Sequence, residues 1–420
     1  MFETIRSRWL PVLAFGLLPA AVAGQEPAKP PASETKPATV KATEKDGFVI
    51  ESADGSYRLR LTGYAQIDAR FYPADEAAQA TDTFLLRRAR PTLQGTLAKR
   101  FDFYLNPDFG GGTAVIQDAY LDVRFSGAAR VRLGKMKPPV GLERLQSGAW
   151  LAFVERALAS SLVPNRDVGA QLHGELAGGR VAYALGVFNG VVDGGSADSD
   201  TGDGKDVAAR LFIQPFRKAE KSPLQGLGFG VAGTLGDQTG SLPSYRSGGQ
   251  LVFYSYAAGA RADGQRSRVA PQASLYSGRV GVVGEWAQSS QYVASGATRA
   301  RVANAAWQAA ASFVITGEPA SASGVRPKRS FDPEAGAWGA LEIAARVNGL
   351  TVDEDAFAFG LADSTRSARK VSAWAVGLNW YLNRNVKLVG SYERTTFEGG
   401  ARDGDRPTEN ALFFRAQLYY

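Results

Sequence analysis

Apolar and polar residues alternate along most of this chain. In YRLRLTGYAQIDARF (57–71), every second residue is apolar or small, and the residues between them are polar and rich in arginine. A period of two is typical of a β-strand with one apolar and one polar face. The same alternation closes the chain in ALFFRAQLYY (411–420). The pattern therefore predicts an all-β protein.

Sixteen segments carry this alternation, each close to the length of about ten residues that crosses a membrane as a tilted strand. They are 57–71, 84–98, 100–109, 114–125, 129–136, 168–177, 180–189, 206–215, 226–237, 267–277, 279–292, 303–316, 336–352, 369–383, 386–398 and 410–420. A further candidate, 249–256, is interpreted as a small hairpin inside a long loop.

The connections between these segments differ in length from one to the next. Tight turns (AKR, SGAA, AGG, SGR and NRN) alternate with long connections near 72–83, 137–167, 190–205, 238–266, 353–368 and 399–409. The connection 317–335 is an exception, because it is long where a short turn is expected. Short turns at one end and long loops at the other are typical of an outer-membrane barrel.

A barrel also explains why every strand needs one apolar face. Hydrocarbon satisfies no backbone hydrogen bond, so a sheet that spans a membrane must close on itself and turn its apolar face outward. A soluble sandwich or propeller is the alternative, and it does not require an apolar face on each strand. We therefore predict a transmembrane antiparallel β-barrel of sixteen strands.

The N-terminal region differs in composition from the rest. Residues 1–23 combine two early arginines, a short apolar run and the cleavage-like sequence AVA, which predicts a signal peptide. Residues 24–46 are rich in Pro, Ala, Lys and Glu and are expected to form a flexible periplasmic linker. The barrel domain is then 47–420. Because the signal peptide predicts export, we expect no nucleic-acid partner.

The charge of the chain narrows its ligands. The formal net charge is +7, and arginine supplies 35 of the 48 basic residues. The guanidinium group offers a planar fork of donors that fits phosphate and carboxylate. An arginine-rich barrel is thus expected to favour anions.

Strand parity places many of these arginines in the lumen. In FLLRRARPTLQG (84–95), Arg88 and Arg90 share the polar face, whereas Arg87 falls on the apolar face and is expected at the extracellular rim or against a neighbouring subunit. Parity also turns inward Arg58, Arg60, Arg124, Arg130 and Arg132. These side chains would attract anions. Alternatively, they pair with the inward carboxylates Asp68, Asp102, Asp118 and Asp122.

Several longer motifs stand in order along the chain. They are FLLRRARPTLQG, IQDAYLDVRF, VRLGKMKPPVGLERLQSGAWLAFVER, GAWGALEIAARVNGL and GLNWYLNRNVKLVGSYERTTFEGG. From about Gly47 to Tyr420, they resemble the phosphate-selective porin O/P family of Gram-negative outer membranes. The resemblance implies a homotrimer in outer-membrane lipids that conducts phosphate or polyphosphate passively and without a cofactor.

The resemblance also implies a loop after the fifth strand that folds into the pore and narrows it. In this chain that loop is 137–167. We expect a short helix over 148–160, packed through Trp150, Phe153 and Leu158. Arg144 and Arg156 are then the cationic groups of the loop.

Three residues match the family's site directly. Asp118 matches an acidic wall residue that organises nearby cations, Arg156 matches a loop arginine, and Ser147 matches a loop serine. The next family serine is replaced by Gly148.

Three more positions depart from the family pattern. Arg144 and Arg132 stand where a phosphate-specific member has lysine, and Arg90 stands where it has tyrosine. The departures favour anions in general and leave phosphate, polyphosphate and organic anions all open.

Other functions have weaker signals. The acidic stretch 193–206 lacks the spacing of a calcium loop, and the cysteine-free chain has no metal motif of the cysteine type. The single histidine, His173, is expected in the lumen without a nucleophile beside it, so we predict no enzyme. A structural or adhesive barrel with little conductance remains the alternative to a channel.

Overall fold

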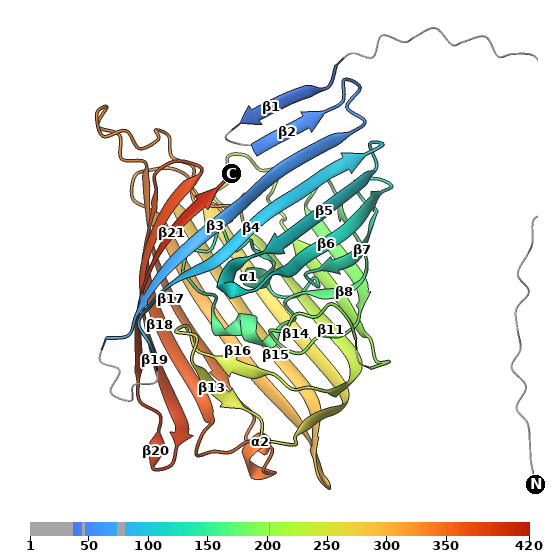
Figure 1. The fold of residues 1–420 in the computed structure, drawn as a ribbon, viewed down its shortest axis with the longest axis vertical. Coiled ribbons are helices and arrows are strands. Elements are labelled where there is room, and N and C mark those ends of the chain that lie inside the picture. The colour runs from blue at the N-terminus through green and yellow to red at the C-terminus, as the bar shows by residue number, and fades with distance from the viewer. Residues whose placement is uncertain (1–36, 44–46, 74–79, 201) are drawn as a thin grey trace, which may run out of the picture. The chain divides into compact units, whose positions relative to one another are not determined.

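The computed structural model describes residues 37–43, 47–73, 80–200 and 202–420. One antiparallel sheet dominates it and closes into a barrel when the last strand pairs with the first, with Phe71 opposite Leu412 and Tyr64 opposite Tyr419 (Figure 1). The sixteen strands of the barrel are β3 (Arg58–Phe71), β4 (Thr83–Leu97), β5 (Phe101–Asp108), β6 (Val115–Arg124), β7 (Arg130–Met136), β8 (Asp167–Leu176), β9 (Val181–Phe188), β10 (Asp206–Ile213), β11 (Gly228–Gly240), β14 (Arg261–Ser277), β15 (Val280–Ser295), β16 (Thr298–Val314), β17 (Ala340–Thr351), β18 (Ala368–Tyr381), β19 (Val386–Ala401) and β21 (Glu409–Tyr419). The predicted fold and strand number are confirmed.

Shorter elements lie between and before these strands. They are β1 (Thr39–Thr43), β2 (Gly47–Glu51), η1 (Gly110–Gly112), α1 (Leu142–Leu145), η2 (Leu158–Leu162), β12 (Ser244–Arg246), β13 (Val252–Ser255), α2 (Asp355–Ala358) and β20 (Gly404–Asp405). None of the helices in the described part of the chain is long and apolar enough to cross a membrane. The hairpin predicted near 249–256 is present, because β12 pairs with β13.

The described residues cover only part of the segments predicted at the N-terminus. The predicted signal peptide 1–23 lies outside the described residues, and the linker 24–46 stays a prediction. Within that range, β1 pairs with β2, and β2 in turn pairs with Arg58–Leu61 at the start of β3. Strand β3 therefore has β2 beside its first residues and β21 beside the rest.

Each strand turns its apolar side chains outward, as the alternation predicted. Along β21, Phe414 and Leu418 are exposed on the outer face, whereas Arg415 and Gln417 are buried inside the barrel. The tight turns lie at one end, which we take as the periplasmic end because outer-membrane barrels place their short turns there. The long connection between β16 and β17, residues 315–339, shares this end.

Strands β14 to β16 run further toward the extracellular end than predicted. Strand β14 begins at Arg261 rather than 267, and the turn between β15 and β16 is reduced to residues 296–297. Apolar alternation marks only the part of a strand that faces hydrocarbon. Backbone pairing continues beyond the membrane, where an outward polar residue such as Gln265 is equally acceptable.

The loop after the fifth barrel strand, residues 137–166, lies inside the barrel as expected. We call it the constriction loop. The helix predicted over 148–160 is wrong: only α1 and η2 form, and most of that segment is irregular. Inward side chains of five strands donate hydrogen bonds to its backbone carbonyl groups. The donor–acceptor pairs are Gln66 with Gly148, Gln417 with Ala149, Lys387 with Leu151, Asn379 with Ala152 and Arg346 with Glu155.

These bonds direct successive carbonyl groups of the loop toward different strands of the wall, whereas in a helix all carbonyl groups point along one axis. Neighbouring apolar side chains of the loop contact different parts of the wall. Phe153 packs against Ala344 and Ala375, whereas Val154 packs against Val389 and Phe413. The predicted packing role of Phe153 is therefore confirmed in a loop rather than in a helix.

An apolar core fills one side of the lumen. The η2 turn of the constriction loop and the loop 241–260, which carries β12 and β13, pack together against inward residues of β11 and β14 to β19. Leu158 and Tyr254 are central members of this core. The space left for solvent therefore lies on the opposite side, between the constriction loop and the wall formed by β3 to β10.

Candidate functional site

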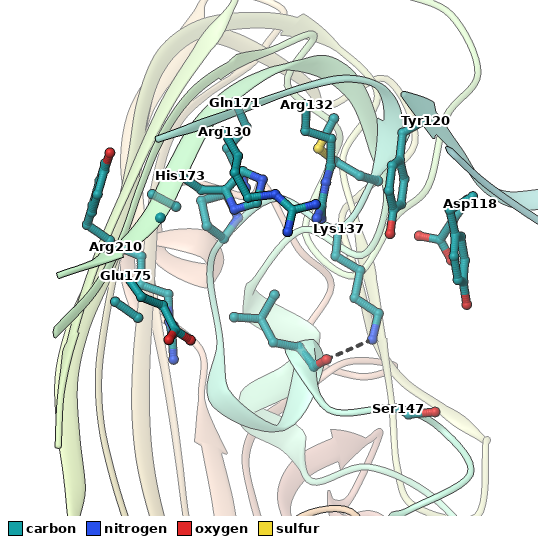
Figure 2. A pocket seen from close by; sticks show the side chains of 18 of the residues that line it. Asp118, Tyr120, Arg130, Arg132, Lys137, Ser147, Gln171, His173, Glu175 and Arg210 are labelled. Atoms are coloured by element: carbon teal, nitrogen blue, oxygen red, sulfur yellow. Dashed lines mark hydrogen bonds between the residues drawn. The ribbon is translucent and has the colours of Figure 1, made fainter. Parts of the chain in front are cut away.

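A cavity of about 910 Å³ lies between that wall and the constriction loop. It reaches from the tight turns near Ser126 and Gly178 up to Asp118, Lys137 and Ser147 (Figure 2). Its charged and phenolic lining includes Tyr64, Arg90, Tyr104, Asp118, Tyr120, Arg124, Arg130, Arg132, Lys137, Arg166, His173, Glu175, Tyr183 and Arg210. The lining is thus predominantly cationic and open to the periplasmic end.

Three cations of the constriction loop lie near one another beside the inner end of this cavity, and Lys137 is the one of them that lines it. Lys137 donates to the carbonyl oxygens of Leu145 (3.2 Å) and Gln146 (2.9 Å), and Arg156 donates to that of Gln146 (2.8 Å) and to that of Glu143 (3.2 Å). Arg144 donates to the side-chain oxygen of Asn165 and to the carbonyl oxygen of Ser160. All of these acceptors are neutral.

The three cations therefore have hydrogen-bond partners but form no direct ion pair, although the Glu143 carboxylate acts on Arg144 and Arg156 from a longer distance. Among the described residues, no carboxylate oxygen lies within 4.0 Å of Lys137, Arg144 or Arg156. The Nε group of Arg144 is buried without a hydrogen-bond partner in the described chain. Uncompensated cations in a partly buried place are energetically costly unless an anion joins them.

Crowding of like charges is visible in the pKa of Lys137. Burial, and then the charges of Arg156 and Arg166, lower the pKa of this ammonium group well below its usual value, whereas Asp118 acts to raise it. Burial also lowers the pKa of Arg144, and the charges of Arg156 and Arg166 lower it further. An anion placed among these groups would reverse the effect, because it favours their charged forms.

Asp118 pairs with a cation that the sequence reading did not single out. Its Oδ2 atom accepts from Nε (3.3 Å) and Nη2 (3.2 Å) of Arg166, and Arg166 also donates to Asn165 at 2.9 Å. Arg144 bonds the same Asn165 side chain at 3.2 Å. Asp118 therefore lies at the edge of the loop cations, and its role in organising them stays a prediction.

The other predicted residues of the site differ in whether their polar groups are already paired. Arg90 donates to Asp108 (2.7 Å) and to the Tyr64 hydroxyl (2.9 Å), so its charge is already paired. Arg88 is buried, and within the described part of the chain it donates to the Gln66 side chain at 2.6 Å. Ser147 is exposed and lines the cavity, where its hydroxyl accepts a hydrogen bond from the amide of Ala149.

In the lower part of the cavity, the inward arginines form ion pairs with inward carboxylates, which was the alternative prediction. Asp102 accepts from Arg124 (2.5 Å) and Arg130 (2.6 Å), and Asp122 accepts from Arg130 (3.0 Å) and Arg132 (2.7 Å). His173 also lies 3.1 Å from Asp122, within the lumen as predicted. These arginines line the path, but two carboxylates offset most of their charge.

Arg58 and Arg60 lie away from this cavity. Both belong to the first residues of β3, where the neighbouring strand is β2 rather than β21. They face inward by parity but stand below the closed part of the barrel. Their predicted contribution to lumen electrostatics is therefore confined to the periplasmic end.

The prediction that Arg87 lies at the rim or at a subunit contact is wrong. The pairing of β3 with β4 shifts between Gln66 and Ile67, so that Arg87 is the extra residue of a β-bulge. Its Nε and Nη2 atoms donate to the carboxylate of Glu155, at 2.8 and 3.3 Å, inside the barrel. A bulge redirects one side chain without disturbing the rest of the strand.

Glu155 is thereby surrounded by arginines. It also accepts from Arg70 at 2.8 Å, and Arg70 lies 3.6 Å from Asp68, which forms a bidentate pair with Arg415. Burial acts to raise the pKa of Glu155, but the charges of Arg87 and Arg88 hold it well below its usual range. This network fastens the constriction loop to the barrel wall across the β3–β21 seam.

Sequence reasoning missed Lys137, Glu155, Arg166 and Arg210. Lys137 and Arg166 mark the two ends of the constriction loop, and a charged residue at a loop boundary is a signal that could have drawn attention to both. Arg210 lies inward on β10 by the same parity that identified the other arginines. The pairing of Glu155 with Arg87 had no local signal.

Comparison with known proteins gives the family. The family model described as phosphate-selective porin O and P matches residues 59–420. Porin O of Pseudomonas aeruginosa is 26% identical over 414 residues, which cover 88% of this chain and 91% of that protein.

Solved structures of outer-membrane proteins share the fold. The outer-membrane channel DcaP of Acinetobacter baumannii has a TM-score of 0.58 at 11% identity, covering 88% of this chain and 99% of that one. OmpT of Vibrio cholerae has a TM-score of 0.55 at 9% identity, covering 87% and 98%. At these identities the similarity shows the fold alone. Together with the family match, it establishes that this chain belongs to the phosphate-selective porin O and P family and is a porin of the Gram-negative outer membrane.

Proposed function

We propose that this porin conducts phosphate or polyphosphate anions through the cavity and that Lys137, Arg144 and Arg156 bind them at its inner end. One observation carries the proposal: these three cations meet at one place and have only neutral hydrogen-bond acceptors. A phosphate oxygen would supply the missing negative charge. Charge-assisted hydrogen bonds of this kind are about twice as strong as neutral ones.

The remaining predicted residues have supporting roles in this proposal. Arg88, Arg90 and Ser147 line or back the binding region, and Arg132 guides anions toward it from below. The stacked rings of Tyr104 and Tyr120 and the guanidinium of Arg132, 4.2 Å from the Tyr120 ring centroid, would keep this wall rigid. Release requires that binding stay weak, and the paired arginines below provide a milder field through which the ion leaves.

We also propose a homotrimer as the functional assembly. One OmpT structure of Vibrio cholerae, with a TM-score of 0.53 to this chain, is described as a trimer form. A passive channel needs no energy coupling and no cofactor, and we propose none here.

Planar bilayer recordings of the purified protein test the function. We expect a reversal potential in a potassium chloride gradient that indicates anion selectivity, together with block of the chloride current by added phosphate or pyrophosphate. Anion selectivity without block would reduce the proposal to a general anion porin. Cation selectivity would contradict it, and an absence of conductance would favour a structural barrel.

Asp118→Asn is expected to tighten anion block and lower single-channel conductance. The substitution removes the negative charge that now engages Arg166 and leaves that guanidinium free to join the loop cations. A stronger cationic site holds an anion longer. Block by phosphate, titrated on single channels of both proteins, provides the measurement. Unchanged currents and an unchanged blocking concentration would refute this role of Asp118.

Anion affinity is expected to rise as the pH falls. The pKa of Lys137 lies well below its usual value because of burial and of Arg156 and Arg166, so the ammonium group loses its proton at a lower pH than an ordinary lysine, below about 10. An anion binds the protonated form better, and lowering the pH increases that form. The slope of chloride affinity against pH gives the readout, because chloride itself does not titrate. Lys137→Gln should reduce the slope, and a variant with an unchanged slope would exclude Lys137 as a titrating group.

A further inference from the structure

The outer face of the barrel has an apolar groove of about 760 Å³ that crosses β15 to β19 and reaches β21. Small residues form its floor, namely Ala311, Ala345 and Gly390. Ala311 pairs with Ala345 across neighbouring strands, and Gly390 pairs with the larger Leu378. Larger side chains form its walls, namely Val280, Phe313, Ile343, Val376, Leu378 and Phe414. The groove therefore interrupts an otherwise full apolar surface.

The groove lies toward the periplasmic end over most of its width. Val280 begins β15, Phe313 is the next-to-last residue of β16, and Ile343 is near the start of β17. All three positions adjoin the periplasmic connections. An occupant that fills the groove would thus belong to the periplasmic leaflet of the membrane.

An aromatic cluster stands where the groove meets that interface. Trp380 follows Leu378 on the same face of β18, and its indole Nε1 donates to the carbonyl oxygen of Trp338 at 2.7 Å. The ring of Phe331 lies 5.6 Å from each of these tryptophan rings. Phe331 and Trp338 come from the long connection 315–339. Aromatic side chains of this kind mark the level of lipid headgroups.

Two cations of the connections at this end, Arg279 and Arg329, form no ion pair among the described residues. The guanidinium of Arg279 lies 4.6 Å from the centroid of the Phe313 ring, and it donates to the carbonyl oxygens of Val314 and Ile315. Arg329, two residues before Phe331, donates to the carbonyl oxygen of Ala335 at 2.9 Å. Both are exposed, and no carboxylate of the described residues lies within 4.0 Å of either.

The acidic residues of the connection form no ion pair with Arg279 or Arg329 among the described residues. Glu318 accepts from the Thr316 hydroxyl and from the amide of Lys328, and Asp332 accepts from the amide of Ala335. Glu334 is exposed and forms no ion pair with Arg279 or Arg329. The connection also adds the exposed cations Arg326 and Lys328. Together with Arg279, the cations at this level outnumber the three carboxylates of the connection by one.

We propose that this region is a binding site for one anionic phospholipid of the periplasmic leaflet. An acyl chain fills the groove over Ala311, Ala345 and Gly390, and the headgroup phosphate lies at the level of Trp380 between Arg279 and Arg329. The apolar groove, the aromatic cluster and the cations each match one part of such a lipid. The site is on the outer face, so it is independent of anion conduction through the lumen.

Native mass spectrometry of the detergent-solubilised protein tests the site. The probes are phosphatidylglycerol and phosphatidylcholine with the same acyl chains, supplied in equal amounts. Two cations at the headgroup level should favour the anionic lipid by on the order of tenfold or more. Equal retention of the two lipids by the wild-type protein would overturn the proposal.

Two variants separate the headgroup from the acyl chain. Arg279→Gln combined with Arg329→Gln should remove the preference for phosphatidylglycerol, whereas Ala345→Phe should fill the groove and reduce binding of both lipids. The matched control is Lys218→Gln with Lys221→Gln, which removes two exposed charges from the connection between β10 and β11 and should leave the preference intact.

Several outcomes would reject the site. A preference that survives loss of Arg279 and Arg329, or that is lost equally in the lysine control, would show that the headgroup contacts are general. Dissociation of the oligomer by Ala345→Phe would mean that a second copy of the chain covers the groove. Chloride selectivity in bilayers should be unchanged in all variants, so failure here is distinguishable from failure of the proposed conduction.

Discussion

Glu155→Gln will loosen the constriction loop and destabilise the barrel by about 3–5 kcal/mol, the usual cost of removing one member of a buried ion pair. The substitution keeps the shape of the side chain and removes its charge. Arg70 and Arg87 then lose the carboxylate that they share, and Arg88, which lies nearby, forms no ion pair with any described residue. The nearest remaining carboxylate, Asp68, is already held by Arg415.

Release of Glu155 is also expected to alter the pore. The carboxylate holds the middle of the loop to β3 and β4, while its carbonyl oxygen accepts from Arg346 on the other side, at 3.0 Å. Without the first attachment, the loop cations next to Glu155 lose their fixed position, Arg156 above all. We expect a noisier and larger single-channel conductance together with a lower unfolding midpoint in denaturant.

A second substitution shows whether charge is the cause. Glu155→Gln combined with Arg87→Gln removes one of the uncompensated cations and should recover part of the lost stability. Glu175→Gln is the matched control, because Glu175 is exposed in the cavity and its ion pair with Arg217 is long, at 3.8 Å. Wild-type stability and conductance in the Glu155→Gln protein would contradict the role of this network.

The same network predicts a dependence of stability on acid. The pKa of Glu155 in the folded protein lies below its value in the unfolded chain, which is about 4.3. Its contribution is therefore complete above that value and is lost as the pH falls through the lower, folded value. Between these limits the wild-type protein should approach the stability of the Glu155→Gln variant.

The strands could be predicted because the membrane imposes a simple rule on them. Every residue that faces hydrocarbon must be apolar, so Leu418 and Phe414 alternate with Gln417 and Arg415. The rule weakens where hydrocarbon ends, and the outer parts of β14 to β16 were missed for that reason. It also fails at a β-bulge, where Arg87 leaves the parity of its strand and enters the barrel.

The candidate site was predictable in its residue types and only partly in its pairing. Parity identified Arg124, Arg130 and Arg132 as lumen residues, and their pairing with Asp102 and Asp122 was the stated alternative. Which arginine would meet which carboxylate depends on the register between strands, and a single sequence does not specify it.

The path of the constriction loop could not be predicted from the sequence, for another reason. Its backbone is held by side chains from five strands that lie far away in the chain, such as Gln417 and Lys387. Local helix propensity over 148–160 is outweighed by these hydrogen bonds. The positions of Lys137, Arg144 and Arg156 follow from that path, so their meeting point appears only in three dimensions.

Arg144→Gln combined with Arg156→Gln is expected to weaken phosphate block by at least about tenfold and to reduce or abolish anion selectivity. A hydrogen bond to a charged group contributes about 1.5–3 kcal/mol, so the loss of two such donors exceeds one factor of ten. Neither arginine forms an ion pair among the described residues, and the buried Glu143 carboxylate, whose charge acts on both, keeps Arg346 at 3.7 Å and its hydrogen bonds from Ala157 and Ser160. The variant should therefore remain folded, which retained conductance would confirm.

Arg130→Gln provides the contrast that makes this prediction sharp. Arg130 lines the same cavity, but Asp102 and Asp122 already offset its charge at 2.6 and 3.0 Å. We expect a small change in selectivity and almost none in phosphate block. If the Arg130→Gln protein loses block while the Arg144→Gln and Arg156→Gln protein keeps it, the binding place lies among the paired arginines of the wall. If only the loop variant loses block, unpaired charge rather than the number of arginines decides where the anion binds.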